Sequence, residues 1–198
     1  MPEPKHWYEP LTPLSFLERI AAVMPEKVAV IDAQKIWTWK DFFDRVNQLS
    51  NALKAIGVGK GENVAFLSRN FPPLLEAHYG VPLTGGALVA INYRLSAREV
   101  ATIVNLCEAK VMFVDAGVAD LVDPADLPNV KTYINVFDGR DTYGENPKRE
   151  LEGEDYETFI GRASKAYIRL ALEDENDIMA IDYTSGTTGK PKGCVYSH

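Results

Sequence analysis

The stretch Asn63–Asp115, NVAFLSRNFPPLLEAHYGVPLTGGALVAINYRLSAREVATIVNLCEAKVMFVD, alternates short apolar runs with amphipathic segments. The apolar runs Asn63–Ser68, Ala87–Ile91 and Lys110–Asp115 have the length of strands, and the segments between them carry helix signals. Apolar strands that alternate with helices are typical of a parallel sheet covered on both faces. The stretch therefore predicts an α/β fold, a mostly parallel sheet flanked by helices, with right-handed connections.

Both helices inside this stretch have a recognisable start. Pro72 opens the first helix, where a missing N–H group does least harm, and Pro82 predicts that this helix kinks or ends early. Ser96 followed by Glu99 forms a capping box, which predicts a second helix over Ala97–Ala109.

The residues before this stretch add two helices and a hairpin. Apolar residues at helical spacing predict amphipathic helices over Pro13–Met24 and Lys40–Ile56, and Gly57 ends the second helix. Between them, the short apolar runs Lys27–Asp32 and Trp37–Trp39 predict a β-hairpin.

The residues after this stretch carry fewer signals. We expect a short helix over Val118–Leu121, a strand over Val130–Phe137 and a helix over Tyr156–Ser164. The polar segment Asp138–Glu154 is interpreted as a surface loop with solvated charges. The apolar run Ile178–Tyr183 predicts one more buried strand.

Composition limits the possible partners of the chain. It has 198 residues, of which 46% are hydrophobic and 25% charged, with a net charge of −7. This acidic balance without a basic face argues against nucleic acid and anionic membranes as partners. The first residues, MPEPKHWYEP, do not resemble a signal peptide, and no apolar run is long enough to span a membrane. We therefore expect a cytoplasmic protein.

Cysteines and histidines do not form a metal-binding or catalytic pattern. Cys107 and Cys194 are interpreted as small buried hydrophobic residues rather than a disulfide or metal site. His6 lies near the terminus, His198 is the last residue, and His78 is expected to be partly buried in a helix. No residue is therefore assigned a catalytic role, and no metal ligand is assigned.

The stretch Tyr183–Gly193, YTSGTTGKPKG, follows the last predicted strand, and Gly193–Tyr196 could form another. Gly186 and Gly189 lack a Cβ atom, so backbone N–H groups can approach an anion closely and form a nest. Side chains of the loop add further donors. Hydroxyl groups come from Thr184, Ser185, Thr187 and Thr188, and positive charge comes from Lys190 and Lys192. This composition suits the binding of a polyphosphate.

Simpler interpretations of this loop compete with a phosphate site. A loop rich in Gly, Ser and Thr is commonly a plain hairpin turn. A Walker A loop needs four residues between its Gly and Gly-Lys-Ser/Thr, followed by a helix. Here only two threonines separate Gly186 from Gly189, and a proline follows Lys190. The spacing therefore excludes a Walker A loop.

The loop Tyr183–Gly193 resembles the signature phosphate loop of the adenylate-forming enzymes, the AMP-dependent synthetase/ligase superfamily. That family includes acyl-CoA synthetases, adenylation domains of peptide synthetases and firefly-type luciferases. Its pattern is an aromatic residue, Thr-Ser-Gly, Ser or Thr, Thr-Gly, any residue and Pro-Lys-Gly, and this sequence matches every position. Residues 37–66 and 85–100 resemble the family too, although Ala90 stands where many members have proline. Because of this resemblance, we interpret the loop as a phosphate-binding loop rather than as a plain hairpin turn.

The resemblance implies a reaction. In the family, the carboxylate of an acid attacks the α-phosphate of ATP, pyrophosphate leaves, and a thiol, commonly that of coenzyme A, takes the acyl group from the acyl-adenylate. By resemblance, Thr184–Lys192 closes over the β- and γ-phosphates. Gly186 and Gly189 would make the loop mobile, and Thr187 and Thr188 would donate hydroxyl groups. Mg²⁺ would offset the remaining charge.

Two further residues receive roles by the same resemblance. Ser185, like Thr184, could donate to the phosphates or steady the loop. Lys192 is expected to hold the base of the loop rather than act as an acid or base. The match covers the whole chain, but only about the first third of a family member.

We therefore expect residues 1–198 to be a partial N-terminal AMP-binding domain of a longer enzyme. In it, residues 1–175 would form an α/β subdomain and residues 176–198 a strand, the phosphate loop and the following strand. The C-terminal domain, with the family's catalytic lysine, would be absent, so the isolated chain is expected to be inactive.

The segment LTPLSFLERIAAVMPEKVAVID, residues 11–32, looks more like fatty or aryl acyl-CoA synthetases than like other members. An acyl-CoA ligase that acts on a fatty acid is thus the favoured function. Alternatives are a non-catalytic remnant, a weak phosphate-binding module, or a piece of a peptide-synthetase adenylation domain or luciferase-like enzyme.

Overall fold

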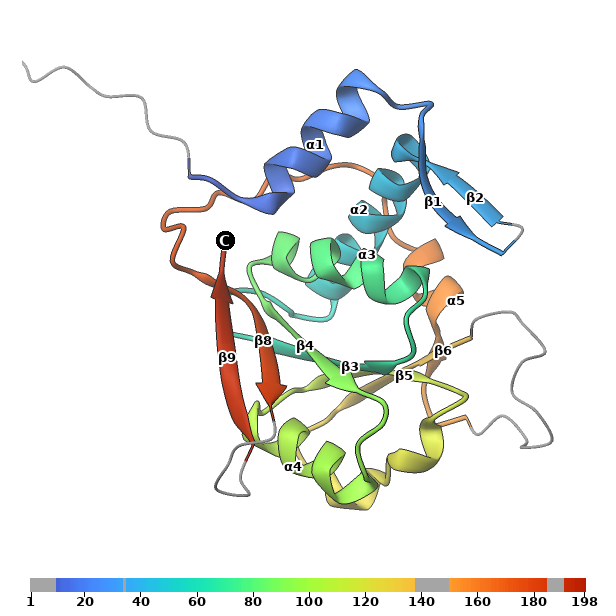
Figure 1. The fold of residues 1–198 in the computed structure, drawn as a ribbon, viewed down its shortest axis with the longest axis vertical. Helices are drawn as coiled ribbons and strands as arrows, with labels where there is room; N and C mark the ends of the chain where they lie inside the picture. The colour runs from blue at the N-terminus through green and yellow to red at the C-terminus, as the bar shows by residue number, and fades with distance from the viewer. Residues whose placement is uncertain (1–9, 34, 138–149, 185–190) are drawn as a thin grey trace, which may run out of the picture.

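The computed structural model describes residues 10–33, 35–137, 150–184 and 191–198 (Figure 1). Its strands are β1 (Val28–Asp32), β2 (Lys35–Thr38), β3 (Asn63–Ser68), β4 (Ala87–Asn92), β5 (Val111–Asp115), β6 (Thr132–Val136), β7 (Glu154–Asp155), β8 (Ile178–Thr184) and β9 (Lys192–Ser197). Its helices are α1 (Pro13–Val23), α2 (Trp39–Ala55), α3 (Pro72–Gly80), α4 (Ala97–Leu106) and α5 (Tyr156–Gly161). The short 3₁₀ turns are η1 (Pro82–Thr84), η2 (Ala119–Leu121) and η3 (Pro124–Asp126).

The main sheet has seven strands in the order β7-β6-β5-β3-β4-β8-β9. Neighbouring strands run parallel except β8 and β9, which form an antiparallel pair at one edge. β1 and β2 form a separate antiparallel hairpin, as the sequence predicts. The predicted mostly parallel sheet flanked by helices is confirmed.

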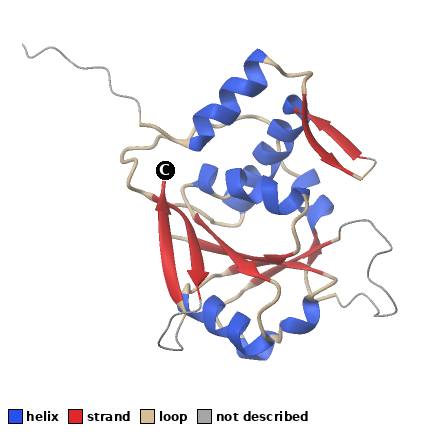
Figure 2. Cartoon of the chain, viewed as in Figure 1, coloured by secondary structure: helices blue, strands red, loops and turns tan. Residues whose placement is uncertain are grey.

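Helices cover both faces of the sheet, so the molecule has three layers (Figure 2). On one face, α2, α3 and α5 pack over side chains such as Val64, Phe66 and Phe113. On the other face, α4 and the turn η2 pack over Ala65 and Leu67. Successive residues of β3 thus enter opposite cores, which explains why this strand is apolar throughout.

Local sequence signals set the ends of the helices. Ser96 and Glu99 form the predicted capping box of α4, and Gly57, with a φ of 91°, follows the C-terminus of α2. α3 ends at Gly80 and Pro82 begins the turn η1, in agreement with the expected early end. α4 ends at Leu106, earlier than predicted, because the backbone then turns into the left-handed conformation.

The segment between β6 and α5 differs from the predicted surface loop where the structure describes it. Leu151 is buried, and its backbone N–H group and carbonyl both bond to the side chain of Asn135, at 3.0 and 2.9 Å. The chain then forms the short strand β7, which the sequence did not indicate. α5 ends at Gly161, before the expected Ser164. Residues 138–149 of the predicted loop lie outside the described residues.

In the described part of the chain, no helix combines the length and the apolar character needed to cross a membrane.

Candidate nucleotide-binding site

The predicted phosphate loop joins β8 to β9. Thr184 is the last residue of β8 and Lys192 the first of β9, and the two are paired across the hairpin. Residues Ser185–Lys190 lie outside the described residues. The anion nest at Gly186 and Gly189 and the hydroxyl donors at Thr187 and Thr188 therefore stay predictions.

The loop leaves the sheet at the edge where ligands bind in parallel α/β folds. β3, β4, β5, β6 and β8 run parallel, so their carboxyl ends share one edge. Leu88 of β4 pairs with Ala180 of β8, which sets Asn92 level with Thr184 at the ends of these strands. Ligands of open α/β sheets commonly bind just outside this edge.

A buried ion pair lies at the same edge of the sheet, between the ends of two strands. Asp115 ends β5 and is fully buried. Its carboxylate accepts hydrogen bonds from Nε and Nη2 of Arg69, at 2.8 and 3.2 Å, and from the backbone N–H group of Gly117, at 2.8 Å. The pair links the ends of β3 and β5. Sequence reasoning missed it, although a charged residue that ends an apolar strand was a usable signal.

The turn after β4 adds positive charge beside the loop. Asn92 Oδ1 accepts a hydrogen bond of 3.0 Å from the backbone N–H group of Arg94 and so shapes the turn. The guanidinium group of Arg94 lies 5.7 Å from the ring centroid of Tyr93 and remains exposed. With Lys192, it gives this edge a charge that suits an anionic ligand.

Close packing explains the last glycine of the motif. A Cβ atom at Gly193 would lie 2.9 Å from Cγ2 of Ile181 and 3.5 Å from Cζ of Tyr183. Both of these β8 side chains pack against the core under α4. Burial raises the pKa of Tyr183 above its usual value. A side chain at residue 193 would therefore push β9 away from β8.

Strand β9 is exposed at every residue. Val195 and Tyr196 are 57% and 53% exposed. The prediction that Cys194 is buried is therefore wrong, because β9 is an edge strand and nothing described covers it. The same prediction is confirmed for Cys107, where burial raises the pKa of the thiol.

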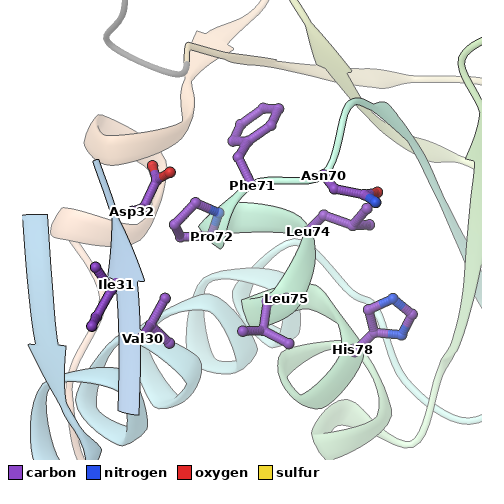
Figure 3. A pocket seen from close by; sticks show the side chains of 9 residues that line it. All are labelled: Val30, Ile31, Asp32, Asn70, Phe71, Pro72, Leu74, Leu75 and His78. Atoms are coloured by element: carbon purple, nitrogen blue, oxygen red, sulfur yellow. The ribbon is translucent and has the colours of Figure 1, made fainter. Parts of the chain in front are cut away.

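His78 borders a cavity of about 430 Å³ between β1 and α3. Figure 3 shows its imidazole on α3 and the Asp32 carboxylate at the far end of the lining residues. His78 remains accessible to solvent while neighbouring groups shield part of its side chain, in agreement with the expected partial burial. Desolvation by neighbouring groups still lowers the pKa of His78, and Asp182 opposes this shift.

The histidines do not come together. His198 Nδ1 lies 2.9 Å from Thr12 Oγ1, at the start of α1, whereas His78 is on α3. Within the described ranges, no group of three or more His, Cys, Asp or Glu side chains could hold a metal ion.

A mostly parallel sheet covered by helices, with a hairpin at its carboxyl edge, is an architecture that many nucleotide-binding α/β proteins share. The sequence profile of the AMP-binding enzyme family matches residues 17–198. The chain therefore belongs to the AMP-binding enzyme family.

Known relatives with similar sequences are CoA ligases. The chain is 34% identical over 195 residues to 4-hydroxybutyrate–CoA ligase 2 of Metallosphaera sedula, covering 97% of this chain and 35% of that protein. It is 34% identical to the peroxisomal butyrate–CoA ligase AAE11 of Arabidopsis thaliana, covering 96% of this chain and 34% of that protein.

A solved structure agrees with this family. The anthranilate CoA ligase AuaEII, in complex with anthranoyl-AMP, superposes with a TM-score of 0.85 at 26% identity, over 97% of this chain and 36% of that one. The chain thus spans about a third of the length of the relatives it matches.

Proposed function

We propose that this chain is the N-terminal part of an ATP-dependent acyl-CoA ligase. The enzyme would activate a carboxylic acid as its acyl-adenylate and transfer the acyl group to coenzyme A. One observation carries the proposal: the complete match of Tyr183–Gly193 to the family's phosphate loop, on a hairpin that ends at the carboxyl edge of the sheet.

In this proposal the loop binds the pyrophosphate part of ATP. Thr184, Ser185, Thr187 and Thr188 supply hydroxyl donors, Gly186 and Gly189 let backbone N–H groups approach, and Lys190 and Lys192 supply charge. As pyrophosphate leaves, negative charge grows on its oxygens, so preorganised donors stabilise the transition state.

Mg²⁺ would enter with the nucleotide. The described residues beside the loop, Thr184, Lys192 and Arg94, are donors and form no carboxylate cluster, and this donor set fits phosphate oxygens. The metal would be held largely by the phosphates of ATP, as is usual for Mg²⁺. No described residue is assigned to coenzyme A.

The acid is proposed to be a fatty acid, on the likeness of residues 11–32 to fatty and aryl acyl-CoA synthetases. Similar proteins carry names for 4-hydroxybutyrate, butyrate and anthranilate, so the family accepts chemically different acids. We also propose a cytoplasmic location, although some relatives are named as peroxisomal.

Residues 1–175 and 176–198 are proposed as the α/β subdomain and the strand–loop–strand unit of the N-terminal domain. The relatives are about three times as long as this chain, which supports placing the remaining machinery in a part of the enzyme outside these residues. The 198-residue chain alone is therefore expected to be inactive.

ATP–pyrophosphate exchange with a panel of carboxylic acids and Mg²⁺ tests the proposal. A full-length enzyme that carries this sequence should exchange in an acid-dependent manner, and the isolated chain should not. In that enzyme, Thr188→Ala or Gly186→Val should lower exchange by about a hundred-fold, because a preorganised donor or the close backbone approach is lost.

Thr102→Ala is the matched control. The Thr102 hydroxyl donates within α4 to the carbonyl of Arg98, at 2.7 Å, so its loss should leave exchange unchanged. Wild-type exchange in both loop variants would refute the role of the loop. Exchange by the isolated chain would refute its predicted inactivity.

A further inference from the structure

An apolar groove of about 540 Å³ runs along α1. Its walls come from three helices and one helix cap: Phe16, Ile20 and Val23 from α1, Met24 directly after α1, Trp39 from α2 and Tyr79 from α3. A volume of this size lies within the usual range for small-molecule sites. The groove belongs to the helical layer and the phosphate loop to the carboxyl edge of the sheet, so the two features are independent.

The groove exists because α1 docks on the helical layer by one side only. Leu14 and Leu17 are buried against α2 and η1, which fixes α1 in place. Phe16 and Val23, on the rest of the helix, stay 62% and 65% exposed. Apolar side chains gathered in a hollow mark an interaction site more often than scattered ones do.

The wall opposite α1 is rigid and aromatic. Phe42 makes edge-to-face contacts with Trp39 and with Tyr79, at centroid distances of 6.3 and 5.8 Å. Phe42 itself is 2% exposed, so it anchors the two rings that line the groove. Because these side chains are already held in place, less conformational entropy is lost when a ligand binds against them.

One charged side chain, Arg19, lines this groove. The neighbouring Glu18 is engaged, because its carboxylate accepts a hydrogen bond from Tyr167 Oη at 3.0 Å and lies 3.7 Å from Nε of Arg169. Arg19 has no hydrogen bond or ion pair from its side chain to any part of the chain that the structure describes. Its guanidinium group is therefore available to a ligand.

We propose that this groove binds an amphipathic monocarboxylate, such as a free long-chain fatty acid. The alkyl chain lies between the apolar face of α1 and the wall of Trp39 and Tyr79, where its burial drives binding. The carboxylate pairs with Arg19, whose planar fork matches two carboxylate oxygens. This inference does not rest on the proposed ligase activity.

Calorimetric titration of the 198-residue chain with dodecanoate below its micelle concentration tests the proposal. We expect saturable binding near one ligand per chain. Arg19→Gln should weaken dodecanoate binding by about ten-fold, the usual value of a charge-assisted hydrogen bond. Dodecanol, which has the same chain length without the charge, should bind Arg19→Gln and wild type equally.

Two more variants separate the groove from non-specific adsorption. Ile20→Glu places a carboxylate in the groove and should abolish dodecanoate binding. Arg98→Gln removes another exposed arginine, on α4, and should change nothing. Circular dichroism of each variant checks that it is folded.

Several results would overturn the proposal. They are the absence of saturable binding, equal dodecanoate affinity in Arg19→Gln and wild type, or unchanged binding in folded Ile20→Glu. Dimerisation that Ile20→Glu abolishes would assign the groove to a second copy of the chain instead. Binding to phosphatidylcholine vesicles without binding of free dodecanoate would assign it to a lipid surface.

Discussion

The centre of the sheet and its β8–β9 edge differ in almost every physical respect. At the centre, Phe66 and Phe113 are fully buried and stacked, with centroids 4.9 Å apart and planes 8° from parallel. At the edge, Val195 and Tyr196 are more than half exposed. Most of the stabilising burial is therefore in the centre of the sheet. The candidate phosphate loop is attached to a hairpin whose outer strand is exposed. Functional loops are often drawn from such less stable regions.

The largest effect should come from emptying the central core. Phe113→Ala removes a ring that stacks on Phe66 and contacts Tyr156 and Phe159 edge to face, so it should cost about 3–5 kcal/mol of unfolding free energy. Tyr196→Ala on β9 should cost less than about 1 kcal/mol, since the ring is largely exposed. Urea unfolding of both variants measures this; equal losses would remove the contrast between the two regions.

A buried ion pair that joins the helices above the core should come next. Glu76 is 1% exposed, accepts a hydrogen bond of 2.6 Å from Nε of Arg45 and another of 2.5 Å from the hydroxyl of Tyr156. Burial and the Glu76 carboxylate raise the pKa of Tyr156 well above its usual value, so the hydroxyl stays a donor. Glu76→Ala should cost about 3 kcal/mol, because Tyr156 loses its acceptor and Arg45 loses its buried one.

Glu157→Ala is the control for this pair. Glu157 also binds Arg45, with a shortest distance of 2.7 Å, but its side chain is 63% exposed. An exposed ion pair contributes little, so the loss in urea unfolding should stay below about 1 kcal/mol. If Glu157→Ala lost more unfolding free energy than Glu76→Ala, the buried Glu76 carboxylate would not be the main source of the stabilisation.

A smaller effect is expected at the hairpin itself. Gly193→Ala places a Cβ atom 2.9 Å from Cγ2 of Ile181 and should cost about 1 kcal/mol through forced separation of the strands. Faster amide hydrogen exchange in β8 and β9, with unchanged exchange in β3 and β5, would show that the damage stays local. Gly161→Ala, where a Cβ atom meets nothing within 4 Å, should be neutral or slightly stabilising.

The smallest effect concerns a charge near the hairpin. The pKa of His78 is lowered, so the unfolded chain binds a proton more readily than the folded one as pH falls below about 6.5. This contribution to stability is therefore present above that pH and is lost as pH falls through the folded pKa. NMR titration should show a still lower His78 pKa in Asp182→Asn, because Asp182 raises it. An unchanged value would mean that the two groups do not interact.

Much of the fold could be predicted because its signals are local. The apolar runs that became β3, β4 and β5, the capping box of Ser96 and Glu99, and the break at Pro82 each act within a few residues. The motif at Tyr183–Gly193 could be found for the same reason, since an anion nest is built from consecutive backbone groups.

Other features depended on residues far apart in the chain. The exposure of Cys194 follows from the place of β9 at the sheet edge, and the same short apolar run would be buried in a central strand. The pairs Arg69–Asp115 and Arg45–Glu76, and the groove beside Arg19, exist only once separate elements pack. The sequence by itself determined the elements, the family motif and their order. Tertiary structure alone decided which side chains contact each other and which stay exposed. The reason is that burial and pairing depend on neighbouring elements that are distant in the sequence.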